Sequence, residues 1–115
     1  MKTLQNNFTT PEQSKRLLEL GVPADSADCY YNNIGDIFIL HHAGVYEDIV
    51  TSRNTPCWSV GRLIEIMALC YEFDFPNNGA VQVYATDIKK GIVVDVLISD
   101  IERYINKIDF SELEN

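Results

Sequence analysis

The sequence of 115 residues has few basic side chains and no long apolar run. It has 9 Lys and Arg against 17 Asp and Glu, a formal net charge of −8. Affinity for phosphate backbones comes largely from Lys and Arg displacing counterions, so this balance disfavours nucleic acid and anionic membrane surfaces as partners. No stretch approaches the roughly 20 apolar residues of a membrane helix, and the N-terminus lacks the apolar run of a signal peptide. We therefore expect a cytoplasmic protein.

Cysteine is also scarce, and its spacing excludes two kinds of site. Cys29, Cys57 and Cys70 are odd in number and none belongs to a CxxC pair, which disfavours a disulfide framework or a zinc knuckle. The chain also lacks a glycine-rich phosphate loop and a calcium loop. We expect reduced, buried thiols and no cofactor or metal.

The length and composition that remain are those of one globular domain. Hydrophobic residues make up 46% and charged residues 23%, and a chain of this size buries about two-thirds of its unfolded surface. We predict a single domain over residues 1–115, with residues 1–8 as a flexible arm or a short lead-in because they are polar and aperiodic.

The stretch from Thr55 to Phe73 predicts the central helix of this domain. Ser59 is placed to cap the helix, so its first turn starts near Val60, while Trp58 and Leu63 occupy the two positions of a hydrophobic staple. The apolar arc that follows leaves little of the helix for water. We therefore expect a helix from Pro56 to Phe73 that lies across a sheet.

An earlier helix has clear start and stop signals. Thr10, Pro11 and Gln13 form a cap, a first-position proline and a capping box, and Gly21 suits the left-handed residue after a helix that ends at about Leu20. The apolar face of this helix is predicted to consist of Leu17, Leu18 and Leu20.

The remaining segments predict strands and a second long helix. Residues 29–31 and 36–42 read as a hairpin around the turn residues 32–35, and residues 81–85 alternate in the period of a strand. Residues 45–51 fit either a strand or a short helix. The sequence thus predicts an α+β fold, with three main helices packed on a small, mainly antiparallel sheet of three or four strands.

The last helix is predicted from Ile92 to Lys107. Ile92, Val93 and Val96 lie off its main apolar stripe, so its first half is apolar nearly all round and must be covered. Because the central helix already claims the core, we expect a homodimer through Ile92 to Lys107.

Three blocks of the sequence resemble a family of short uncharacterised proteins that recurs in the genomes of gut anaerobes, often among prophage or mobile-element genes. The blocks are EQSKRLLELGVPADSAD (Glu12 to Asp28), PCWSVGRLIEI (Pro56 to Ile66) and IDFSELE (Ile108 to Glu114). The resemblance implies a mobile-element origin but no activity, cofactor or catalytic residue. Residues 32–54 match no block.

A few residues invite a site. His41 or His42 with Cys57 would suit metal binding or acyl transfer, but adjacent strand residues face opposite ways, so at most one histidine can join a shared site. Hydrogen bonding to backbone or water is the better reading for a strand-end histidine, and packing for Cys57.

The candidate binding residues are an arginine and three aromatic side chains. Arg62, in the first turn of the central helix, pairs with Glu65 or binds an anion, and the pair is the simpler reading. Tyr30 and Tyr31 could line a recognition surface, and Trp58, first a packing residue, is included with them.

The leading functional hypothesis is a non-enzymatic accessory or protein-interaction module of mobile-element origin. It is favoured because the sequence contains no catalytic constellation, cofactor motif or basic patch. The alternative is a small hydrolase or transferase that uses Cys57 with His41 or His42. A third hypothesis is an acidic mimic of DNA.

Overall fold

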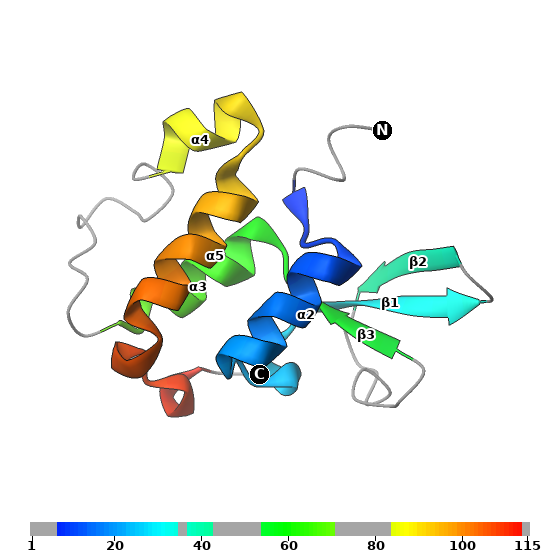
Figure 1. Ribbon diagram of the computed structural model, residues 1–115, viewed down its shortest axis with the longest axis horizontal. Helices are drawn as coiled ribbons and strands as arrows, with labels where there is room; N and C mark the ends of the chain where they lie inside the picture. The colour runs from blue at the N-terminus through cyan, green and yellow to red at the C-terminus, as the bar shows by residue number, and fades with distance from the viewer. Residues whose placement is uncertain (1–6, 35–36, 43–53, 71–83, 114–115) are drawn as a thin grey trace.

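The protein has an α+β fold, as the sequence predicts (Figure 1). The computed structural model describes residues 7–34, 37–42, 54–70 and 84–113. Its longer elements are α2 (Pro11–Leu20), β1 (Cys29–Ile34), β2 (Ile37–His42), β3 (Asn54–Cys57), α3 (Val60–Ala68), α4 (Ala85–Lys90) and α5 (Val93–Tyr104). Three short 3₁₀ turns complete them: η1 (Ala24–Ser26), η4 (Ile105–Lys107) and η5 (Phe110–Glu112).

The sheet has the strand order β2-β1-β3, and both neighbours run antiparallel to β1. The hairpin of β1 and β2 is as predicted. Asn32 and Asn33, however, belong to β1 and pair with Ile39 and Phe38 rather than forming the turn. Pairing continues to Ile34 and Ile37, so β1 extends further than its sequence signal indicates. Residues 35 and 36 lie outside the described part. The open segment 45–51 lies outside the described residues.

Helix α2 matches its prediction at both ends. The Thr10 hydroxyl accepts from the Gln13 N–H, and the Gln13 side chain accepts from the Thr10 N–H, so the capping box is complete. Gly21 has φ 104°, a left-handed conformation that favours glycine. The N–H groups of Gly21 and Val22 then bond back to the last turn, as in a Schellman motif.

Helix α3 starts where predicted but is shorter than the predicted helix from Pro56 to Phe73. Ser59 caps it, accepting from the Arg62 N–H at 3.1 Å. Pro56 and Cys57 belong to β3, because they pair with β1. The helix ends at Ala68 and Cys70 forms a bridge with Ile108. That pairing with the C-terminal segment replaces the last predicted turn; residues 71–73 lie outside the described part.

The strand predicted over residues 81–85 is also corrected where the structure describes it. Tyr84 is the residue before helix α4, and Ala85 opens that helix. Gly91, with φ 73°, ends α4 in the left-handed conformation, and Ile92 donates back to the Asp87 carbonyl. Period-two alternation over a few residues therefore did not identify a strand at Ala85. Residues 81–83 lie outside the described residues.

Helix α5 is covered by its own chain over most of its length. Val93 is buried and Val96 packs partly buried against the core, whereas Ile92, before the helix, stays 43% exposed. The argument that Val93 and Val96 require a second copy is therefore wrong. The reason is that α3 and α5 pack against each other and share the core, which the sequence argument assigned to α3 alone.

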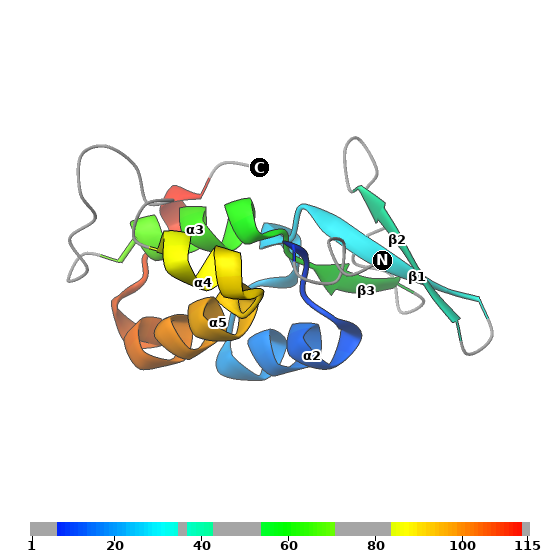
Figure 2. The same cartoon turned by 90° about the horizontal axis from the view of Figure 1, so that it is seen from above.

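The helices and the sheet lie side by side rather than stacked. Figure 2 shows α5 and α2 next to each other along one side of α3, while the three strands extend from one end of this helical part. Helix α2 contacts both β3 and α5. The expectation that the central helix lies across the sheet is not met, because the apolar face of α3 is occupied by α5.

The chain before α2 is tied to the start of α3. Phe8 forms an antiparallel bridge with Ser59, and the Thr9 N–H donates to the Trp58 carbonyl at 2.9 Å. Thr9 is completely buried. At the other end, Phe110 and Leu113 pack partly buried against the core.

Candidate functional site

Trp58 is a core residue. Its side chain is fully buried, and its indole N–H donates to the Ser26 hydroxyl at 3.0 Å. The Ser26 hydroxyl in turn donates to the Pro23 carbonyl at 2.6 Å. Burial leaves Trp58 no surface for a partner, so it joins the η1 turn to α3 instead of taking the binding role predicted for it.

Arg62 joins the same two segments. Its side chain is only 11% exposed, and its Nε donates to the Ser26 carbonyl at 2.7 Å. The predicted pair with Glu65 is present, with 3.4 Å between the guanidinium nitrogen and the carboxylate oxygen. The sequence did not predict the contact with Ser26. This contact explains why a cation is tolerated in the first turn of the helix, where the helix dipole disfavours positive charge.

Asp28 completes this arrangement. Its two carboxylate oxygens accept from the N–H and the hydroxyl of Ser59, at 2.9 and 2.5 Å. The N-cap residue of α3 is thus itself held by a carboxylate that lies just before β1, 31 positions earlier in the chain. We call Ser26, Asp28, Trp58, Ser59 and Arg62 the α3 capping network. Its bonds are internal to the fold, so it is a structural unit rather than a ligand site.

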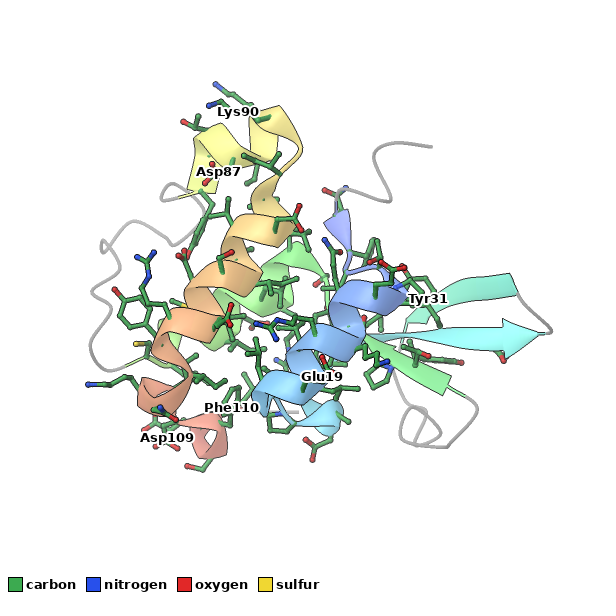
Figure 3. All side chains as sticks on the ribbon, viewed as in Figure 1. Glu19, Tyr31, Asp87, Lys90, Asp109 and Phe110 are labelled. Carbon is green, nitrogen blue, oxygen red and sulfur yellow. The ribbon has the colours of Figure 1, made fainter. Side chains whose placement is uncertain are left out.

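The predicted tyrosine pair does not form one surface. Tyr30 packs partly buried against the core, while the Tyr31 hydroxyl donates to the Thr9 carbonyl at 2.9 Å. Figure 3 shows Tyr31 beside the start of α2. Consecutive strand residues face opposite sides of a sheet, which separates the two rings.

Cys57 lies in a buried polar cluster with Thr9 and Ser14. Its thiol donates to the Thr9 carbonyl at 3.3 Å, and the Thr9 and Ser14 hydroxyls lie 2.7 Å apart. All three side chains are fully buried. In the sheet, Cys57 lies directly opposite Cys29, which is also buried and forms no disulfide.

These surroundings make both thiols weak acids. Burial raises the pKa of Cys57 to about 11 and that of Cys29 to about 12, and the nearby Asp28 carboxylate adds to the increase for Cys29. A thiolate is the nucleophilic and metal-binding form. The Cys57 environment therefore opposes the activation that a catalytic cysteine requires.

The predicted partners of Cys57 lie on another strand. The sheet register places His42 opposite Cys29 on β2, and His41 opposite Tyr30. Because β1 lies between β2 and β3, the His42 backbone is two strand spacings from Cys57, roughly 10 Å. Among the described side chains, no three His, Cys, Asp or Glu residues gather in a way that could hold a metal ion.

The surface feature that the sequence did not reveal is a cleft of about 810 Å³ between α2 and β3. Leu18 is 37% exposed there, although the sequence predicts it on the apolar face with the fully buried Leu17. We call this feature the α2–β3 cleft. The described residues that line it are Thr10, Pro11, Glu12, Lys15, Leu18, Thr55 and Pro56.

The lining of the cleft suits binding rather than catalysis. Pro11 and Leu18 provide apolar surface, and the buried Pro56 forms part of the wall. Two hydroxyls and two opposite charges complete the lining. The lining residues of α2 are spaced three or four positions apart, so they lie on one side of the helix and form one wall of the cleft. A leucine exposed beside two prolines was the available sequence signal, but it becomes visible only once β3 is placed next to α2.

Comparisons with known proteins yielded no relative. No family model matches the chain, and neither the curated proteins nor the solved structures contain a match. None of the helices in the described part of the chain has the length and apolar content needed to cross a bilayer.

Proposed function

We propose that this protein is a small, non-enzymatic interaction module that binds another protein through the α2–β3 cleft. The observation that supports this most directly is the exposure of Leu18 beside Pro11 and Pro56 in a cleft of about 810 Å³. Apolar surface collected in a concave site and bordered by polar groups is typical of recognition sites.

The state of Cys57 also supports a non-enzymatic role over the alternative hydrolase. A thiol whose pKa is about 11 is almost entirely protonated at neutral pH. It is fully buried, and its S–H group already donates a hydrogen bond to the Thr9 carbonyl.

We further propose a cytoplasmic location and a scaffold of three main helices, α2, α3 and α5, beside an antiparallel sheet of three or four strands. Three buried cysteines that form no disulfide suit a reducing compartment. The described strands number three, so a fourth would come from residues outside the described ranges. Membership of the mobile-element family stays a prediction.

The proposal is tested with the protein as bait in extract of its native host. Leu18→Lys removes the apolar wall of the cleft, and Ile88→Lys is the matched control. Ile88 is 39% exposed, and Figure 3 shows its helix, α4, away from the cleft with Lys90 pointing outward. Both changes alter the net charge equally.

We expect at least one protein to be retained by the wild type and by Ile88→Lys but lost with Leu18→Lys. Circular dichroism melting should show that all three baits are folded, since both substituted side chains are exposed. Identical sets of retained proteins for all three would contradict binding through the cleft.

Self-association through Ile92 to Lys107 stays a prediction. Among the described residues near this helix, the exposed large apolar side chains are Ile88 and Ile92, whereas a stable dimer buries roughly 800 Å² on each partner. Light scattering at micromolar concentration tests it. A mass of two chains that falls to one in Ile92→Lys would support the dimer, and a wild-type mass of one chain would contradict it.

A further inference from the structure

The α2–β3 cleft runs along the edge of the sheet. Strand β3 pairs with β1 on one side, and none of the described strands pairs with its other side. Thr55 and Pro56 both line the cleft. Consecutive side chains point to opposite faces of a strand, so a cleft that touches both lies along the edge rather than over one face.

The hydrogen-bonding direction of this edge can be derived from Trp58. The Trp58 N–H donates to the Thr9 hydroxyl at 3.0 Å, and its carbonyl accepts from the Thr9 N–H at 2.9 Å. Backbone groups alternate in direction along a strand, so those of Pro56 and Asn54 face the same side as those of Trp58.

Pro56 agrees with this direction independently. Proline has no N–H to donate, and within sheets it is found where that side of the strand has no ladder partner. The outer side of β3 therefore offers the carbonyls of Asn54 and Pro56 together with the Asn54 N–H.

The chain itself uses the neighbouring part of this edge. Phe8 lies opposite Ser59 in an antiparallel bridge, and Thr9 bonds to Trp58. At Thr10 the chain turns into α2 instead of continuing beside Pro56. Among the described residues, pairing along this edge thus stops where the cleft begins.

We infer that the α2–β3 cleft binds an extended, basic peptide segment of the partner protein, which adds as a strand to the outer edge of β3. This inference rests on the proposed function. The peptide N–H groups would donate to the Pro56 and Asn54 carbonyls, and an apolar side chain would pack on Leu18. Strand addition to an exposed edge is a common mode of peptide recognition.

Charge selects a basic segment. The chain has a net charge of −8, which draws cationic partners by long-range attraction. Within the cleft, Glu12 can pair with a Lys or Arg of the peptide, and Lys15, one helical turn further along α2, repels a basic side chain at its own position. The two charges together fix where the basic residue lies.

A library of displayed linear peptides, selected on the wild type and counter-selected on Leu18→Lys, provides the probe. We expect enriched peptides that combine an apolar residue with a basic one. The best peptide, made synthetically, should bind Ile88→Lys as it binds the wild type, and bind Leu18→Lys roughly tenfold more weakly or worse.

Backbone methylation then tests strand addition itself. Methylating single peptide nitrogens should weaken binding roughly tenfold at alternate residues and little at those between, since only every second N–H faces β3. A peptide that is sensitive to Leu18→Lys but indifferent to every methylation would overturn strand addition while leaving the interaction module intact. Failure to enrich any peptide on the wild type over Leu18→Lys would overturn this inference, and the bait experiment then judges the proposed function separately.

Discussion

Helices α2 and α3 are both capped by a hydroxyl, yet the two starts are held in different ways. At α2, Thr10 and Gln13 satisfy each other within four residues. At α3, the Ser59 hydroxyl accepts from Arg62, but the N–H and O–H of Ser59 are held by Asp28, 31 positions earlier. The first start is local, whereas the second exists only when two distant segments have met.

The largest effect that separates the two helices is expected from a charge in the core. Leu63→Asp in α3 places a carboxylate at a completely buried position, which should abolish cooperative unfolding. Leu18→Lys in α2 should leave it nearly unchanged, because Leu18 is exposed. Thermal melting followed by circular dichroism measures both. A cooperative melt for Leu63→Asp would mean that α3 is not central to the core.

Asp28→Ala and Thr10→Ala compare the distant capping of α3 with the local capping of α2. Asp28→Ala removes two hydrogen bonds to Ser59, and we expect it to lower the free energy of unfolding by about 2–4 kcal/mol, since bonds to charged groups are the stronger ones. Thr10→Ala loses a cap and should cost about 1 kcal/mol. Urea unfolding measures the two, and equal losses would contradict the contrast.

The Cys57 thiol, which lies between the starts of α2 and α3, should make the stability of the protein depend on pH. Cys57 has its pKa raised from 9.0 to about 11 by burial. The folded state therefore favours the protonated thiol, so its stabilising effect is complete below pH 9 and decreases as pH rises towards 11. Urea unfolding across this range should show a steeper loss for wild type than for Cys57→Ala, and matching slopes would show that Cys57 is not responsible.

The smallest effect is expected on the outer side of α2. Arg16 and Glu102 form an ion pair, but both side chains are about half exposed. Solvent screens such a pair, and Glu102→Gln should change the free energy of unfolding by less than about 0.5 kcal/mol. Urea unfolding at low and high salt checks this; a loss comparable to that of Asp28→Ala would show that α2 also depends on distant contacts.

The difference between local and distant contacts also explains what the sequence could predict. The capping box at Thr10 and the left-handed Gly21 are signals within one or two turns, and both are found as predicted. Asp28 was missed because its partner lies 31 positions away and a carboxylate in a turn usually needs no partner. Arg62 shows both cases, since its contact with Glu65 was predicted and its bond to Ser26 was not.

Element ends and the cleft depended on tertiary contacts for the same reason. The apolar pattern after Ala68 continues in the sequence, but Cys70 pairs with Ile108 instead of extending the helix. Leu17 and Leu18 are equivalent by residue type, yet Leu17 is buried and Leu18 lines the cleft. Helical spacing locates a face, whereas its neighbours decide which part of that face is covered.

The contact between Thr9 and Trp58 also has a consequence for protein synthesis. These residues are 49 positions apart, so the N-terminal segment emerges from the ribosome well before its partner exists. The Thr10–Gln13 box can nucleate α2 in the nascent chain, but Thr9 must wait until Trp58 has been translated. Asp95, which accepts from Gln13 across 82 positions, arrives later still. Docking of α2 is therefore expected only after Asp95 has been translated.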